Sequence, residues 1–370
     1  MIFKRTQCVL TGNKVDLQHL HTFEHFPIYM GCTTSDQKYD SFADMTWTVS
    51  PQSGSLQLSY LIDPNILYKN HHNSGSIGGI WNKHHIDFFN FIRSGNHKNI
   101  LEIGGGSGTL ANIFLQNSNE GNWTIIEPSA QNIVCTNRLN FIQELFENYQ
   151  FTKKFDSIVH SHVMEHVSYP IEFLKKIHSL LSIGGSHYIS IPNMKHWLQQ
   201  GYSSTLTFEH TYYIDYNVLE CLLNSNGFII ERSIVGEHSI FVKAIKTEII
   251  TNTKIELSYA KDLFKSYVKN LKDDIDIIQS KIKDQKFYLF GAHIFSQMLI
   301  NLGLNENQIE YILDNDQRKQ NKRLYGTKCM VKPPLCLKDV KDPIVVLRVG
   351  IYTEEIKESI LKINSSAIFI

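Results

Sequence analysis

The residues best suited to bind a ligand are an acidic residue and a run of glycines, in the segment Glu102-Ile-Gly104-Gly105-Gly106-Ser107-Gly108. Glycines after a buried strand permit a tight turn and let a ligand approach the bare backbone. A dinucleotide site has the spacing G-x-G-x-x-G and places pyrophosphate at a helix N-terminus. Here the spacing is acidic-x-G-x-G-x-G, with Thr at position 109. An acidic residue beside the glycines suits a cationic sulfonium, and the pattern therefore favours S-adenosylmethionine over a dinucleotide.

A second acidic residue, Glu127, ends the next apolar run and is followed by Pro128. A carboxylate at this place can accept hydrogen bonds from both hydroxyls of a ribose. Further along the chain, Phe141 is placed to stack on an adenine ring, although a core position would equally suit an aromatic side chain. The alternative is an ordinary dinucleotide turn that binds another nucleotide. The residues assigned to the cofactor are Glu102, Gly104, Gly105, Gly106, Gly108, Glu127, Pro128, Phe141 and His162.

Four polar residues stand in or directly after a third apolar run: His160, His162, Glu165 and His166 in FDSIVHSHVMEHV. A strand in the middle of a parallel sheet delivers such residues to the crevice at its carboxyl end. Histidines at this spacing are compatible with a metal site, but the Glu165-His166 pair is more typical of methyltransferases than of zinc proteins. We therefore predict no metal ligands here.

The elements that must position these residues alternate between strand and helix patterns, as a parallel sheet requires. The predicted helix 171–181 is expected to stop at Gly184-Gly185. The apolar runs 228–235 and 239–246 are expected to pair as an antiparallel hairpin. The predicted strands are 99–104, 123–128, 155–162 and 186–193, and the other predicted helices are 108–116 and 216–228. This order predicts a doubly wound, Rossmann-like α/β domain.

Three domains are predicted along the 370 residues. Residues 1–80 are aromatic and His-rich and form a small, β-rich or irregular cap. Residues 81–246 form the doubly wound domain. Residues 247–370 start with a long amphipathic helix (257–284) and repeat the strand–helix alternation, with strands at 286–292, 309–316 and 343–349, as a second, smaller α/β domain.

The composition excludes several classes of partner. Lys+Arg and Asp+Glu are both 36, so the formal net charge is zero, which disfavours nucleic acid or a membrane surface as a partner. No signal peptide or run of transmembrane length is recognised. The six cysteines are scattered, which is typical of reduced thiols and predicts a cytoplasmic protein.

The run 99–246 resembles class I S-adenosylmethionine-dependent methyltransferases, with VMEHVSYP where relatives have V-L-E-H-V-x-x-P. Nearly the whole chain resembles the three-part sugar C-methyltransferase family, which has a zinc-binding N-terminal segment, a methyltransferase core and a C-terminal α/β domain. The segments that carry this resemblance are 55–68, 72–77, 82–89, 206–228, 289–292, 312–316, 324–334 and 354–360. The resemblance implies a nucleotide-linked or otherwise activated sugar as the methyl acceptor.

The chain departs from this family at the zinc ligands. Two C-x-x-C pairs are usual, whereas the corresponding positions here are Cys8 with Thr11 and Ser50 with Ser53. A hydroxyl does not replace a thiolate on zinc. His19, His21 and His25 have no spacing that would rescue a site. We predict no structural zinc.

The resemblance also implies roles at the acceptor. His210 is the expected base, Glu209 orients it or contacts substrate, and His166 is a substrate hydrogen-bond partner or an alternative base. Tyr213 is expected to hold or polarise a sugar carbonyl. The expected substrate contacts are Asn193, Thr207 and His72, the last two standing where relatives have tyrosine.

Several functions remain open from the sequence. His210 could remove a proton from either a carbon or a hydroxyl of the acceptor, so both C- and O-methylation remain open. The alternatives are O- or N-methylation of a small molecule outside sugar metabolism, a non-catalytic binding protein on this fold, and an NAD-dependent oxidoreductase, which the glycine spacing disfavours. The C-terminal domain is expected to shape the acceptor pocket or a homodimer interface.

Overall fold

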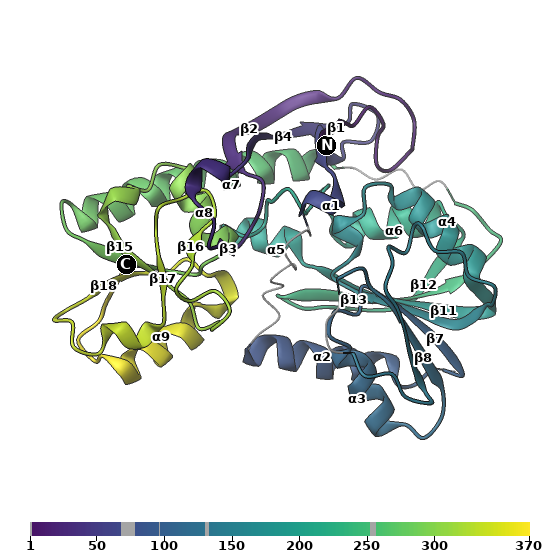
Figure 1. The fold of residues 1–370 in the computed structure, drawn as a ribbon. Coiled ribbons are helices and arrows are strands. Elements are labelled where there is room, and N and C mark those ends of the chain that lie inside the picture. Colours follow the sequence, from purple (N-terminus) through teal and green to yellow (C-terminus); the bar gives the residue numbers. More distant parts are fainter. Residues whose placement is uncertain (1, 68–77, 96, 130–132, 252–256) are drawn as a thin grey trace.

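The computed structural model describes residues 2–67, 78–95, 97–129, 133–251 and 257–370. Its centre is a seven-stranded sheet with the order β12-β13-β11-β10-β7-β8-β9 (Figure 1). β13 runs antiparallel to both of its neighbours, and the other pairs are parallel. The strands are β7 (Asn99–Ile103), β8 (Asn122–Ile126), β9 (Leu139–Ile142), β10 (Phe155–Ser161), β11 (Leu181–Pro192), β12 (Phe228–Val235) and β13 (Ser239–Lys246).

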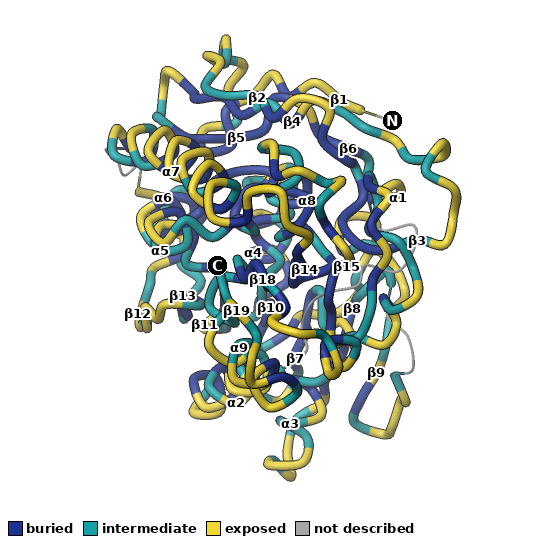
Figure 2. Tube along the Cα trace, turned by 90° about the vertical axis from the view of Figure 1, so that its left-hand side faces the viewer, coloured by how far each residue is buried: buried dark blue, intermediate teal, exposed yellow. Residues whose placement is uncertain are grey.

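Helices cover both faces of this sheet. In Figure 1, α2 (Gly79–Ile92) and α3 (Thr109–Asn117) lie below the sheet, and α4 (Pro170–Leu180) and α6 (Tyr216–Asn224) lie above it. Each pair of helices buries its apolar face in a separate core cluster. Most residues of the central strands are buried, whereas α2 and α3 expose their outer turns (Figure 2). The predicted doubly wound fold is confirmed, and so is the β12–β13 hairpin.

The C-terminal part contains a five-stranded sheet in which every neighbouring pair is parallel. A long helix, α7 (Ser258–Ile282), precedes this sheet, and α5 (Met194–Gln199) packs against α7. The strands, in sheet order, are β17 (Val331–Lys332), β15 (Ile309–Leu313), β14 (Phe287–Phe290), β18 (Ile344–Val346) and β19 (Ile368–Phe369). The helices are α8 (Ile294–Asn301), α9 (Thr353–Ile363) and the 3-10 turns η3 (Glu306–Gln308), η4 (Pro334–Leu337) and η5 (Gly350–Tyr352).

The N-terminal segment is β-rich and bridges the two larger parts (Figure 1). β3 pairs antiparallel with β16 (Arg323–Leu324) of the C-terminal part. Arg323 supports this contact through two 2.6 Å bonds to the Asp40 carboxylate. The segment contains β1 (Ile2–Lys4), β2 (Gln18–Pro27), β3 (Cys32–Thr33), η1 (Gln37–Tyr39), β4 (Phe42–Val49), β5 (Leu56–Leu58), β6 (Tyr60–Ile62) and α1 (Pro64–Leu67).

The expected helix stop at Gly184-Gly185 is wrong. α4 ends at Leu180, and β11 begins at the next residue and runs through both glycines. The pairing of β10 with β11 shifts register there. A Cβ at Gly185 would lie 2.9 Å from the Ser182 carbonyl and 3.1 Å from the Asp156 carbonyl. Glycine is needed here because two backbones approach closely at a strand irregularity.

A buried pair of histidines makes the stability depend on pH. His160 and His187, on β10 and β11, have ring centroids 4.9 Å apart, and none of their four ring nitrogens has a hydrogen-bond partner in the described chain. Burial, with a smaller contribution from His160, lowers the pKa of His187 well below 6.5. The unfolded chain therefore binds a proton below pH ~6.5 that folded His187 does not, and stability falls as the pH decreases.

We predict that His187→Leu weakens this pH dependence. Each pH unit below ~6.5 costs the wild type about 1.4 kcal/mol through this residue, so the variant should lose about 2 kcal/mol less between pH 7.5 and 5.0. Urea unfolding at the two pH values measures the difference. Identical pH dependence in the two proteins would show that His187 is not held neutral.

Candidate functional site

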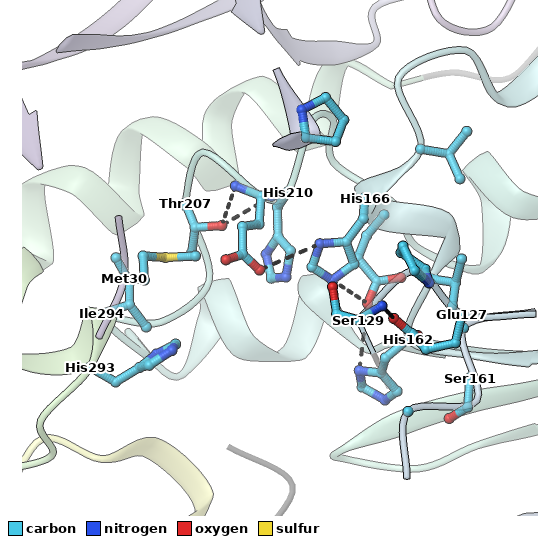
Figure 3. Close-up of a pocket in the computed structure, with 18 of the residues that line it drawn as sticks. Met30, Glu127, Ser129, Ser161, His162, His166, Thr207, His210, His293 and Ile294 are labelled. Carbon is cyan, nitrogen blue, oxygen red and sulfur yellow. Dashed lines mark hydrogen bonds and ion pairs between the residues drawn. The ribbon is translucent and has the colours of Figure 1, made fainter. Parts of the chain in front are cut away.

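A cleft of about 1590 Å³ runs along the carboxyl edge of the seven-stranded sheet. It includes the point between β7 and β10 where the strand order reverses, which is where doubly wound sheets bind ligands. Its other wall comes from the C-terminal part. Met30, His293 and Ile294 lie on that side in Figure 3, opposite Glu127, Ser129 and Ser161. The cleft is large enough for two ligands, because one small-molecule pocket occupies about 300–1000 Å³.

The glycine loop forms one end of this cleft. Gly104 has φ +70° and a Cβ there would lie 2.5 Å from Val163 Cγ2, so only glycine fits. Gly106 has φ +52°, and a Cβ built on it would meet nothing within 4 Å, because this residue faces the cleft. The loop therefore offers bare backbone to a ligand, as its spacing predicted.

Glu102 is buried beneath this loop, only 4% exposed, and still contributes to the cleft wall. Its Oε2 accepts a 2.8 Å hydrogen bond from Trp123 Nε1. Burial raises the pKa of Glu102 to about 7, the Trp123 bond opposes this, and nearby Glu127 adds to it. A cationic ligand group in the cleft would favour the ionised form of Glu102.

Glu127 follows the carboxyl end of β8 and lines the cleft with Pro128 (Figure 3). Its Oε1 accepts a 2.9 Å hydrogen bond from the backbone N–H of Ser129. This bond holds the Glu127 carboxylate at the end of β8. Glu102, Glu127 and the glycine loop therefore line the same part of the cleft. The residues present fit an adenosyl ligand with a ribose and a cationic sulfonium.

Two of the predicted cofactor residues lie elsewhere. Gly108 is the N-cap of α3, in the left-handed region at φ +77°, and does not line the cleft. Phe141 packs against the core cluster under α2 and α3, and Phe146 is the phenylalanine of FIQELF that lines the cleft. The period-2 pattern of β9 directs Phe141 to the core. His162 does line the cleft, as predicted.

His210 lines the cleft between the groups of Met30 and Glu127 (Figure 3), and Glu209 also contributes to the lining. Thr207 Oγ1 accepts 3.0 Å hydrogen bonds from the backbone N–H groups of both residues, so Thr207 shapes the loop that carries them. His210 Nδ1 lies 2.8 Å from the carbonyl oxygen of Thr205. A carbonyl only accepts, so neutral His210 carries its proton on Nδ1, and Nε2 is the basic atom.

His166 connects its own pair, Glu165-His166, with the second pair, Glu209-His210. Its ring centroid is 5.1 Å from that of His210, and its Nδ1 lies 3.8 Å from Glu209 Oε2. On its other side, His166 Nε2 lies 3.7 Å from Glu165 Oε1. Glu165 is fully buried, and burial raises its pKa to about 8. The two pairs, 44 positions apart in the sequence, thus form one cluster.

Two predicted acceptor residues, Tyr213 and Asn193, are not brought to this cluster. Tyr213 is 1% exposed, and its hydroxyl donates a 2.9 Å hydrogen bond to Asp215 in the core, so the prediction that it contacts substrate is wrong. Asn193 caps α5 through His196 N and donates to the Gly236 carbonyl, and it does not line the cleft. His72 lies outside the described residues.

The N-terminal segment connects the loop that follows β10 with the loop that precedes α6. Arg5 is buried, and its guanidinium donates to the carbonyls of Thr211 (2.7 Å) and Ser168 (2.6 Å). Thr211 N also donates to the Glu165 carbonyl at 2.9 Å. Burial lowers the pKa of Arg5 to about 10, so the side chain remains charged. Arg5 is therefore a positioning residue for both loops.

Replacing Arg5 with Met is expected to lower the unfolding free energy by roughly 2–4 kcal/mol, because two charge-assisted hydrogen bonds disappear from a buried site. If the cleft is an active site, turnover should fall mainly in kcat, with little change in KM, and Arg5→Lys should restore part of it. Thermal unfolding and steady-state kinetics measure both effects. Exposed Arg93→Met is the matched control. Equal behaviour of the Arg5 and Arg93 variants would contradict the role.

The four positions equivalent to zinc ligands do come together. Cys8 Sγ lies 3.1 Å from Ser53 Oγ. Burial raises the pKa of Cys8, but the surrounding hydroxyl groups of Ser50, Ser53, Thr11 and Ser55 outweigh it, and the net pKa is lowered. One thiol among hydroxyls does not fit structural zinc. The absence of zinc here stays a prediction.

Sequence reasoning missed several residues of the cleft. Trp81, His85 and His238 line it beside His162, and Arg318 and Lys322 line it from the C-terminal part. The signal for the last two was the basic run QRKQNKR directly after β15, since a parallel strand delivers such a run to the carboxyl edge of its sheet. For Trp81 and His238, the sequence held no comparable signal.

Comparison with known proteins identifies two regions. Residues 82–232 match the family model for a methyltransferase domain, and residues 242–368 match that for a C-methyltransferase C-terminal domain. No curated protein matches the chain. None of the described helices is both long and apolar enough to span a bilayer.

Two similar solved structures each match less than half of the chain. The N-methyltransferase NodS from Bradyrhizobium japonicum is 15% identical, with a TM-score of 0.36, covering 45% of this chain and 96% of its own. The 1,6-didemethyltoxoflavin-N1-methyltransferase from Burkholderia thailandensis is 16% identical, with a TM-score of 0.36, covering 46% and 81%.

Proposed function

The chain is a class I S-adenosylmethionine-dependent methyltransferase with a C-methyltransferase C-terminal domain, and from this premise we propose that its acceptor is a nucleotide-linked or otherwise activated sugar. The observation that carries the proposal is the position of Arg318 and Lys322. Both side chains line the same cleft as the Glu209-His210 pair, but from the C-terminal part. An acceptor with a sugar at one end and phosphates at the other matches this arrangement.

The size of the cleft supports an extended acceptor. Its volume of about 1590 Å³ exceeds what the cofactor alone requires. Arg318 is held by Asp316 through bonds of 2.8 to 3.2 Å, which directs its guanidinium but neutralises part of its charge. Lys322 is half-buried at the cleft wall. Cationic side chains bind phosphate oxygens through charge-assisted hydrogen bonds, and these two would hold the phosphate end.

The chemistry at the sugar end requires removal of one proton. S-adenosylmethionine supplies an electrophilic methyl group on a sulfonium. His210 Nε2 takes a proton from the acceptor atom, whose electron pair then forms the new bond to the methyl carbon while the sulfur–methyl bond breaks and leaves its electrons on sulfur. His166, between Glu165 and Glu209, contacts the acceptor. We propose an α-carbon of a keto-sugar as the methylated atom, in keeping with the C-terminal domain type; a hydroxyl is the alternative.

The test is methyl transfer from labelled S-adenosylmethionine to a panel of nucleotide-linked keto-sugars and uncharged small molecules, with products identified by mass spectrometry. Lys322→Ala should raise the acceptor KM about 10–100-fold and leave the cofactor KM unchanged, because the lost contact is to phosphate. Exposed Lys338→Ala is the control. Methylation of the uncharged compounds alone would instead indicate a function outside sugar metabolism.

A further inference from the structure

Three histidines from distant parts of the chain converge beside the cofactor end of the cleft. His84 comes from α2, His162 follows β10, and His238 precedes β13. One ligand nitrogen from each lies within 4.8 Å of the others. His84 Nδ1, His162 Nε2 and His238 Nδ1 lie 3.2, 2.8 and 2.7 Å from a common neighbour, Ser239 Oγ. One ring nitrogen of each imidazole therefore faces the same centre, which the Ser239 hydroxyl occupies.

The outer ring nitrogens of two of these histidines are also supported. His162 Nδ1 faces the carboxylate of Glu165, 3.6 Å from Oε1. His84 Nε2 lies 2.8 Å from Ser161 Oγ. Metal-binding histidines characteristically place a carboxylate or another polar group at the ring nitrogen that faces away from the ion, which fixes the tautomer and the ring orientation.

The surroundings hold the imidazoles in place. The Trp81 ring makes edge-to-face contacts with all three, with ring centroids 5.2, 5.0 and 4.9 Å from those of His84, His162 and His238. His162 also has φ +53°, a conformation that non-glycine residues adopt where the surrounding structure demands it.

We propose that His84, His162 and His238 form a binding site for one divalent transition-metal ion of the zinc type. Three neutral nitrogen ligands without a thiolate suit Zn²⁺ or Co²⁺. Ligands about 2.1 Å from such an ion are about 3.4 Å apart, so small side-chain rotations close the present spacing. His162 and His238 line the cleft, which gives the ion a path of entry. This proposal departs from the sequence-based prediction that the protein has no metal ligands. It does not depend on which acceptor is methylated.

The test is a Co²⁺ titration of untagged protein freed of metal with a chelator, followed by visible d–d absorption. The expected result is one bound equivalent with the intense bands of a four- or five-coordinate nitrogen site. His238→Ala should weaken Co²⁺ binding at least about 100-fold. Loss of a residue that only supports a metal ligand typically lowers metal affinity about 10–100-fold, and loss of a ligand itself should lower it more. His238 is chosen because it is half-buried, and circular dichroism checks that the variant folds.

Two further variants identify the site. Ser239→Ala should keep Co²⁺ binding, because the three imidazoles remain. His210→Gln should also keep it, although Glu165, His166 and His210 are a second group with metal-ligand spacing. Absence of d–d bands in folded wild-type protein would overturn the proposal, as would full binding in His238→Ala. Loss of binding in His210→Gln alone would place the ion at the catalytic cluster and overturn it as well.

Discussion

His210→Gln is expected to lower kcat for methyl transfer by about 10²–10⁴-fold, the usual contribution of a positioned general base. Glutamine can still donate to the Thr205 carbonyl, which His210 Nδ1 contacts at 2.8 Å, so the loop should keep its shape. What the variant lacks is a basic nitrogen at the position of Nε2. Cofactor affinity should change little, since the proposed cofactor residues Glu102, Glu127 and the glycine loop are untouched.

The pH–rate profile separates a base from a structural residue. If His210 accepts the proton, the wild-type rate falls in acid as the imidazole becomes protonated, and the variant lacks this acid limb. His166→Gln is the matched comparison, because His166 lies in the same cluster with its nitrogens 3.7 and 3.8 Å from Glu165 and Glu209. A larger loss in His166→Gln, with the acid limb retained in His210→Gln, would assign the base to His166.

Glu127→Ala is expected to weaken binding of S-adenosylhomocysteine by about 10²–10⁴-fold. A carboxylate that accepts hydrogen bonds from both ribose hydroxyls contributes about 1.5–3 kcal/mol for each bond, and alanine removes both. Glu127→Gln should have a smaller effect, because an amide oxygen still accepts one of them. Isothermal titration calorimetry with S-adenosylmethionine and S-adenosylhomocysteine measures the affinities directly, without an acceptor.

Glu120→Ala is the control for this experiment, because Glu120 is an exposed carboxylate close to Glu127 in the sequence. It should bind both adenosyl compounds like the wild type. NAD should not bind to any of the proteins, because the glycine spacing does not fit a pyrophosphate. Retained adenosyl affinity in Glu127→Ala would show that the ribose is held by another group.

The sequence by itself determined the doubly wound sheet and the approximate carboxyl ends of its four predicted central strands. Apolar runs such as 99–103 and 155–161 recur with amphipathic helices between them, and this local pattern sets both the elements and their order. Glu102, the loop from Gly104 to Gly106, and Glu127 follow from that order, because residues after parallel strands meet at one edge. Local signals were enough for them.

Only the tertiary structure decided which other side chains reach the cleft. Tyr213 and Phe141 had suitable positions in the sequence but face the core, because burial of an aromatic ring depends on which surface its element covers. Gly184-Gly185 resembled a helix stop, yet the close approach of the Asp156 carbonyl made it a strand irregularity.

Groups of side chains that come from distant segments of the chain were the hardest to predict from the sequence. Arg5 connects the loop after β10 with the loop before α6 by donating to backbone carbonyls, and such contacts cannot be recognised from the sequence. His84, His162 and His238 meet only because α2 packs beside the ends of β10 and β13. Arg318 and Lys322 reach the cleft because a second sheet presents its carboxyl edge to it. Contacts of this kind depend on the packing of whole elements, whereas a sequence pattern specifies one element at a time.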